Sequence, residues 1–134
     1  MQEYNAPVED ILFVIENLSS DIKSTNEEYS DPDLLKQIFE EAGKFSSNVL
    51  APLNPIGDKE GISLENGLVR MPPGFIDAFN QYIQGGWASV AGSKKYGGQE
   101  MPWNIVGALN EIWHAANMSF SLNMLLTQGA IEVI

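Results

Sequence analysis

Apolar residues recur along most of this chain at the three- and four-residue spacing that places them on one face of an α-helix. Within residues 8–18 they stand at offsets 0, 3, 4, 7 and 10, and acidic residues lie between them. Residues 31–51, 74–84 and 102–120 repeat this spacing, and each stretch begins at or beside a proline. From residue 118 to residue 134 apolar residues lie on every side, which is typical of a helix buried between layers. The pattern therefore predicts a helix in each of these stretches.

The segments between the predicted helices carry turn signals. Pro52 and Pro55 are expected to end the second helix, because proline lacks the amide hydrogen that an interior helical turn uses. Two short apolar runs, at 62–64 and 68–69, flank Asn66 and Gly67, a pair typical of a tight hairpin turn. Residues 19–30 are polar and residues 87–98 are rich in glycine, so both are expected to be loops. The predicted fold class is all-α, a helical bundle with one minor β-hairpin near residues 62–69.

Charge is distributed unevenly along the 134 residues, whose formal net charge is −11. Residues 1–66 hold 14 acidic and 4 basic residues, whereas residues 67–134 hold 4 and 3. After Met101 only Glu111 and Glu132 are charged. A helix of a small self-contained domain keeps a charged face toward water, so further structure is expected to cover this last third. We therefore expect this chain to be the N-terminal piece of a longer protein.

Composition also argues against several classes of site and partner. Seven basic residues on an acidic chain disfavour nucleic-acid binding, because affinity for phosphates depends on lysine and arginine. The absence of cysteine and the single histidine leave no thiolate or multi-histidine metal site. No apolar run approaches the roughly 20 residues of a bilayer span, and the first residues lack a signal-peptide pattern. The cytoplasm is the expected compartment, with no nucleic-acid partner, no integral membrane segment and no metal.

Three features could carry chemistry, and each also has a purely structural explanation. His114 could act as a base or ligand, or simply bond to a neighbour. Glu111 could act as a general base, or lie solvated or in a salt bridge. Residues 94–99 could cradle a phosphate with backbone amides, or form a turn that requires glycine. The motifs of the common nucleotide-binding and hydrolase sites are absent, so the residues alone identify no reaction.

Several motifs, in order, resemble the N-terminal domain of acyl-CoA dehydrogenases. The central passage has Gly-Trp, then Tyr-Gly-Gly-Gln, then Met-Pro, at residues 86–87, 96–99 and 101–102. Further matches cover essentially the whole chain, at residues 4–7, 40–45, 49–54, 72–75, 116–120 and 126–130. They resemble a subgroup with an extra N-terminal helix, which includes the 3-methylmercaptopropionyl-CoA dehydrogenases. The resemblance implies an extension helix and loop at residues 1–30 and a helical domain at residues 31–134, truncated before a flavin-binding β-domain.

The resemblance also implies a reaction and a cofactor. In acyl-CoA dehydrogenases a glutamate of the last of three domains removes the α-proton of an acyl-CoA, while FAD accepts the β-hydride and a 2-enoyl-CoA results. From the family we further expect that electron-transfer flavoprotein accepts the electrons and that the parent enzyme is a homo-oligomer. The flavin-binding strands and the catalytic glutamate belong to the two later domains. The resemblance therefore assigns no catalytic residue to this chain and predicts that it is inactive alone.

By the same resemblance, the last helix forms a wall of the acyl pocket. The start and phase of that helix point five residues toward the acyl chain: Ser121, Leu122, Leu125, Leu126 and Gly129. Ordinary packing against the β-domain would also explain these residues. Two positions depart from the family pattern, because Glu100 stands where the family prefers glycine and Gln128 stands where it prefers histidine.

Two other functions are consistent with the sequence. A related acyl-CoA oxidase would share this domain and differ mainly in the domains that follow. A stand-alone helical interaction module, without flavin chemistry, would bind a partner through its nearly uncharged last third. The linked motifs favour the acyl-CoA dehydrogenase domain over both.

Overall fold

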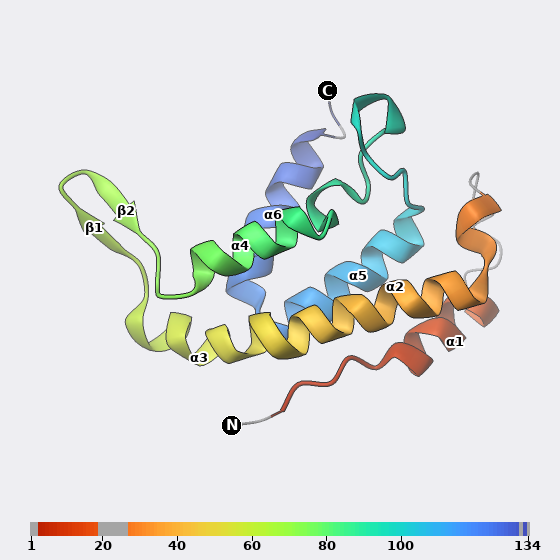
Figure 1. The fold of residues 1–134 in the computed structure, drawn as a ribbon, viewed down its shortest axis with the longest axis horizontal. Coiled ribbons are helices and arrows are strands. Elements are labelled where there is room, and N and C mark those ends of the chain that lie inside the picture. The colour runs from red at the N-terminus through yellow and green to blue at the C-terminus, as the bar shows by residue number, and fades with distance from the viewer. Residues whose placement is uncertain (1–2, 19–26, 132, 134) are drawn as a thin grey trace.

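The computed structural model describes residues 3–18, 27–131 and 133 (Figure 1). Its principal elements are α1 (Val8–Leu18), α2 (Pro32–Phe45), α3 (Ala51–Glu60), β1 (Ser63–Glu65), β2 (Leu68–Arg70), α4 (Phe75–Gln84), α5 (Trp103–Ala116) and α6 (Met118–Ile131). Short 3₁₀ segments lie at Glu27–Ser30, Trp87–Ser89 and Lys94–Tyr96. The predicted all-α bundle with a minor hairpin is confirmed. Most of the loop predicted at 19–30, and residues 132 and 134 of the last predicted helix, lie outside the described residues.

The helical path continues past Pro52 and Pro55, so the prediction that these prolines end it is wrong. A π-helical turn, Ser46–Leu50, joins α2 to α3, and the amide of Ala51 donates to the carbonyl of Ser46. Pro52 then falls in the first turn of α3, where a backbone amide has no partner within the helix to lose. Pro55 follows inside α3. The wider π turn resets the start of the helix and so accommodates Pro52, whereas Pro55 removes one hydrogen bond inside α3.

The hairpin forms where the Asn-Gly pair predicts it. Ser63 pairs with Arg70, Leu64 with Val69, and Glu65 with Leu68 in an antiparallel register. Asn66 and Gly67 have φ angles of +52° and +78°, the left-handed conformation that both central residues of a type I′ turn require. All strand residues are exposed, and Figure 1 shows the hairpin standing clear of the helices.

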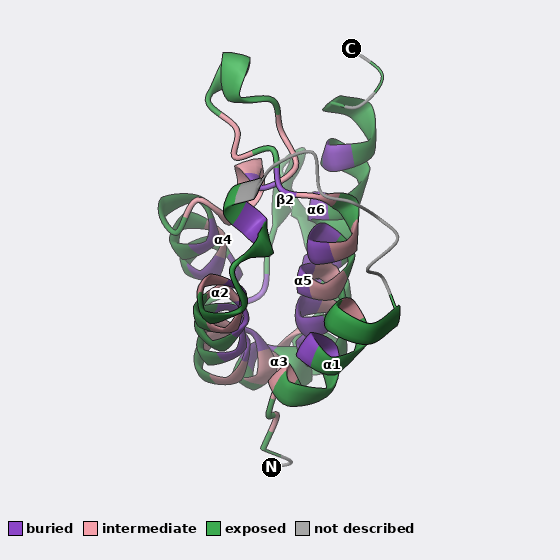
Figure 2. Ribbon diagram, turned by 90° about the vertical axis from the view of Figure 1, so that its right-hand side faces the viewer, coloured by how far each residue is buried: buried purple, intermediate pink, exposed green. Residues whose placement is uncertain are grey.

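The core is centred on an aromatic cluster shared by three helices. Tyr82 of α4 meets the ring of Trp113 of α5 edge-on, with centroids 5.1 Å apart, and Phe120 of α6 at 5.9 Å. Buried positions gather on the facing sides of the helices (Figure 2). The helix α5 is the most buried, through Ile105, Val106, Leu109, Ile112, Trp113 and Ala116. None of the helices in residues 3–18 and 27–131 has the length and apolarity of a membrane span.

Candidate functional site on helix α6

One residue, Asn117, sets the start and direction of α6. It separates α5 from α6 with an extended backbone and is 1% exposed. Its Oδ1 accepts hydrogen bonds from the amide of Phe120 at 3.1 Å and the hydroxyl of Ser119 at 2.8 Å, so it caps the helix. Its Nδ2 donates to the carbonyl of Leu50 at 3.1 Å, at the end of the π turn. Sequence reasoning placed Asn117 in a family motif but did not identify it as a cap, although asparagine directly before a helical stretch is a cap signal.

The helix α6 presents a continuous apolar row to solvent. Leu122, Leu125 and Leu126 are 47%, 43% and 77% exposed, and Gly129 continues the row at offset 7. A Cβ built on Gly129 would meet no atom within 4 Å, so the space above this position is open. Four of the five residues predicted to face the acyl chain thus share one surface, which we call the α6 stripe (Leu122, Leu125, Leu126 and Gly129).

Ser121, the fifth of these residues, lies on the inner side of α6. It is 3% exposed, and its hydroxyl donates to the carbonyl of Asn117 at 3.0 Å. It shares this side with Met124 and Gln128, which are also buried. Successive helical residues are about 100° apart, so Ser121 cannot share a narrow stripe with both Leu122 and Leu126. In this fold Ser121 faces the core, and the stripe is purely apolar.

Gln128 is a buried polar residue whose side chain is unsatisfied. It is 6% exposed, and neither its Nε2 nor its Oε1 has a hydrogen-bond partner within the described residues. Burying an amide without a hydrogen bond costs about 1–3 kcal/mol in proteins. Sequence reasoning identified Gln128 as a departure from the family pattern, but its burial could be read only from the packing of α6.

A groove with a volume of about 340 Å³ lies between α4 and α6, beside the α6 stripe. Its lining is mainly apolar: Met71, Phe75, Ile76, Phe79, Ser119, Phe120 and Asn123. The hydroxyl of Ser119 already donates to Asn117, which leaves few polar groups to orient a polar ligand. The groove therefore suits an apolar group.

The glycine-rich loop before α5 is a self-bonded turn. Each backbone amide from residue 94 to residue 101 donates to an acceptor between residues 89 and 100. A Cβ on Gly98 would lie 2.0 Å from the carbonyl oxygen of Gly92, which explains the glycine at this position. No amide of this stretch remains free to bind an anion, so the phosphate-cradle hypothesis is wrong and the turn explanation holds.

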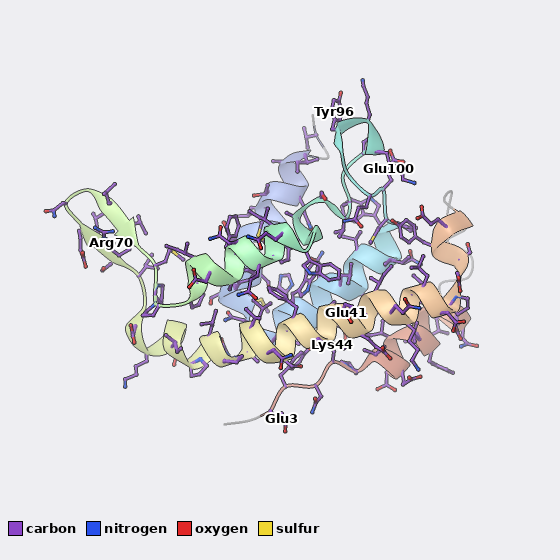
Figure 3. All side chains as sticks on the ribbon, in the orientation of Figure 1. Glu3, Glu41, Lys44, Arg70, Tyr96 and Glu100 are labelled. Carbon is purple, nitrogen blue, oxygen red and sulfur yellow. The ribbon has the colours of Figure 1, made fainter. Side chains whose placement is uncertain are left out.

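Glu100 stabilises this loop from a position where glycine would be the easier choice. Its φ is +52°, a conformation that glycine adopts without strain. Its Oε1 accepts hydrogen bonds from the amide of Lys94 at 2.9 Å and the hydroxyl of Ser93 at 3.0 Å (Figure 3). These bonds, that of the Lys94 amide first, hold the pKa of Glu100 below its ordinary value. The carboxylate thus offsets the backbone strain by tying the loop together.

The other two candidate residues fit their structural explanations. Nδ1 of His114 donates to the carbonyl of Asn110, one turn earlier in α5, at 2.6 Å. Glu111 is exposed, so it lacks the buried surroundings on which the general-base hypothesis depends. Among residues 3–18, 27–131 and 133 no group of three or more histidine or acidic residues could hold a metal ion. Neither residue forms part of a catalytic cluster here.

Comparison with known proteins agrees with the motifs. No protein-family model matches this chain. The chain is 41% identical over 135 residues to 3-methylmercaptopropionyl-CoA dehydrogenase from Ruegeria pomeroyi, and the alignment covers 98% of the chain. It spans only 23% of the length of that enzyme. The resemblance to acyl-CoA dehydrogenases is therefore confirmed, and nearly the whole chain is similar to one part of a member of that family.

Proposed function

We propose that this chain serves as the N-terminal helical domain of an FAD-dependent acyl-CoA dehydrogenase, and that the α6 stripe forms a wall of its acyl pocket. The α6 stripe is the observation that carries the proposal, because it is a solvent-facing row of leucines on a helix without charged residues. Contiguous exposed apolar surface of this kind marks a binding or interaction site. The similarity to the Ruegeria dehydrogenase supports the choice of family.

The chemistry of the α6 stripe suits an alkyl or thioether tail. Each methylene that moves from water to an apolar wall contributes about 0.8 kcal/mol, and leucine side chains provide such a wall. The open space above Gly129 leaves depth for the end of the tail. In this proposal the chain binds and orients the acyl group and excludes water, while it supplies no proton-transfer group.

The flavin is assigned to other parts of the proposed enzyme. The glycine-rich loop does not fit the phosphates of FAD, because the amides of residues 94–101 all bond within their own loop. When bound in the proposed enzyme, FAD would supply the hydride acceptor. The base that removes the α-proton would likewise come from another domain. The proposed enzyme also has a β-domain and a C-terminal domain, and it passes its electrons to electron-transfer flavoprotein. It is homo-oligomeric and lies in the cytoplasm.

We further propose a short acyl-CoA with a thioether tail as the substrate. The relative matched by this chain is named for 3-methylmercaptopropionyl-CoA, and the chain aligns with it over 98% of its length. A thioether is apolar and polarisable, so it packs well against leucine.

A chimera tests the proposed function. This chain replaces the aligned segment of the Ruegeria enzyme, and FAD content and dye reduction by 3-methylmercaptopropionyl-CoA are measured. We expect a yellow, active protein. In that background Leu126→Asp should raise KM at least about tenfold, because a charge would enter the apolar wall.

The matched control is Leu18→Asp on α1, because Leu18 is 75% exposed and Leu126 is 77% exposed. This substitution should leave KM unchanged. A chimera that binds FAD but oxidises no acyl-CoA would contradict the proposed enzyme. Equal KM values for the chimera and its Leu126→Asp variant would contradict the role of the α6 stripe. A chimera that folds without FAD would favour the stand-alone interaction module.

A further inference from the structure

Asn66, in the turn of the hairpin, stands before a glycine, as no other asparagine of this chain does. The side-chain amide of an asparagine can react with the backbone amide of the next residue, which makes asparagine a thermally labile residue. A side chain on that next residue obstructs the approach, and glycine has none. The covalent structure therefore hinders this reaction least at the pair Asn66-Gly67.

The surroundings of this pair leave both reacting groups open. Asn66 and Gly67 are exposed, and a Cβ built on Gly67 would meet no atom within 4 Å. Within the described residues, neither the backbone amide of Gly67 nor the side chain of Asn66 takes part in a hydrogen bond. The reaction between them therefore has no hydrogen bond of its own to break.

The conformation of the native turn nevertheless keeps the reacting atoms apart. Asn66 and Gly67 have φ angles of +52° and +78°, as in a type I′ turn, whose first central residue has a ψ of roughly +30°. This ψ points the nitrogen of Gly67 away from Cβ of Asn66. A planar five-membered ring needs both atoms on the same side of the Cα–C bond of Asn66. Ring closure at Asn66 therefore requires the turn to open.

The hairpin can open with little effect on the rest of the fold. Each strand has three residues, all exposed, and β1 and β2 pair only with each other among the described residues. Figure 1 shows the hairpin standing clear of the helices. A two-stranded hairpin is marginally stable in water, and such segments open at a much lower free energy than the core. By contrast, Asn110 and Asn123 lie within α5 and α6, whose helical backbone is held by the bundle.

We propose that Asn66 is a site of spontaneous covalent modification, at which its side chain cyclises onto Gly67 whenever the hairpin opens. The deprotonated amide nitrogen of Gly67 attacks Cγ of Asn66, so that a bond between these two atoms forms. The bond from Cγ to Nδ2 breaks, and Nδ2 leaves as ammonia with the proton that the Gly67 amide has lost. The product is a cyclic imide.

Water then opens the imide in one of two ways. Cleavage between Cγ and the Gly67 nitrogen leaves an aspartate on an ordinary backbone, and Asp-Gly also suits a type I′ turn. Cleavage between the nitrogen and the backbone carbonyl carbon of residue 66 leaves an isoaspartate, whose main chain runs through Cβ and Cγ. No atom is oxidised or reduced, and water is the co-reactant.

The isoaspartate product changes the hairpin. It adds one atom to the main chain of a two-residue turn, so the pairing of Glu65 with Leu68 no longer closes in the native register. Both products add one negative charge to a chain whose formal net charge is −11. Modification thus loosens the connection between α3 and α4. The proposal does not depend on the acyl-CoA dehydrogenase function.

Peptide mapping by mass spectrometry tests the proposal. The full chain is kept at neutral pH and physiological temperature, and a synthetic peptide of residues 61–71 serves as the open-chain reference. We expect the fragment with residues 66–67 to gain about one dalton, to separate into aspartate and isoaspartate forms, and to react faster in mild alkali. Gly67→Ala should slow the reaction at least about tenfold. Alanine at a positive φ also loosens the turn, which by itself would speed the reaction, so a slower rate reports the obstructed attack.

A second pair of variants tests the requirement for opening. Val69→Gly weakens β2 and should raise the rate up to about fivefold, toward that of the peptide. Val133→Gly makes the same change at an exposed position far along the chain and should keep the wild-type rate. Far-UV circular dichroism should show the wild-type helical signal for both variants, because the hairpin stands clear of the helices.

Three results would overturn the proposal. The first is an unmodified Asn66 in the chain after the reference peptide has fully reacted. The second is faster modification of another asparagine than of Asn66. The third is equal rates for the wild type and Val69→Gly, which would exclude opening of the hairpin as the controlling step.

Discussion

Tyr82 carries a hydroxyl that the fold buries without a partner, so replacing Tyr82 with phenylalanine should stabilise the protein. The residue is 0% exposed, and its Oη has no hydrogen-bond partner within the described residues. The ring is well packed, with its centroid 5.1 Å from that of Trp113 and 5.9 Å from that of Phe120. Tyr82→Phe keeps these ring contacts and removes only the unsatisfied group.

The expected gain follows from two opposing effects. A buried polar group without a partner destabilises the fold by about 1–3 kcal/mol, and removing it recovers that free energy. The small cavity left by the oxygen offsets this gain by a few tenths of a kcal/mol, at ~24 cal/mol per Å³. We expect the free energy of unfolding to rise by about 1 kcal/mol and Tm to rise by about 3–5 °C. Tyr4 is the matched comparison, because its hydroxyl donates to the carbonyl of Ile112 at 2.9 Å. Tyr4→Phe should lower the free energy of unfolding by about 1 kcal/mol.

Urea unfolding followed by far-UV circular dichroism measures both changes, with an unchanged slope against urea showing that only stability differs. If Tyr82→Phe lowers the free energy of unfolding as much as Tyr4→Phe does, the reasoning is refuted and the hydroxyl is satisfied. Burial also raises the pKa of Tyr82 above its ordinary value of 10.0. The folded state therefore favours the neutral phenol. The resulting pH-dependent contribution of Tyr82 to the free energy of unfolding is complete below pH 10.0 and is lost as pH rises through the pKa of the folded state. Tyr82→Phe should show the smaller loss of stability in alkali.

Four other outcomes are expected. Asn117→Ala should lower the free energy of unfolding by about 2–3 kcal/mol in urea, because it removes the cap of α6 and the bond to Leu50; an unchanged midpoint would exclude this role. Gln128→Met should raise the free energy of unfolding by about 1 kcal/mol, and a fall would mean that the amide has a partner. The lowered pKa of Glu100 contributes stability that is present above pH 4.5 and lost as pH falls through the folded pKa, so Glu100→Gln should flatten the acid limb of unfolding. The purified chain should be colourless and inactive on acyl-CoAs, and flavin absorbance that survives gel filtration would contradict this.

Local features of the chain were readable from the sequence because neighbours along the chain determine them. The spacing of Val8, Ile11 and Leu12 predicts α1, and the Asn66-Gly67 pair predicts the hairpin turn with its positive φ angles. The family resemblance and the phase of α6 together grouped Leu122, Leu125, Leu126 and Gly129 on one side of a helix. They also grouped Ser121 with them, which the structure buries on the inner side. The family resemblance depended on linked motifs, and the 41% identity to an acyl-CoA dehydrogenase agrees with it.

Contacts between distant segments decided the remainder. The cap at Asn117 reaches back across 67 positions to Leu50, at the end of the π turn. The amides of residues 94–101 all bond to acceptors between residues 89 and 100, which excludes a phosphate cradle that glycine spacing alone allowed. Sequence periodicity therefore determined which residues share a face of a helix or strand. Only tertiary packing decided which faces are buried and which hydrogen-bonding groups remain unsatisfied. The reason is that burial depends on which other segments of the fold pack against a face.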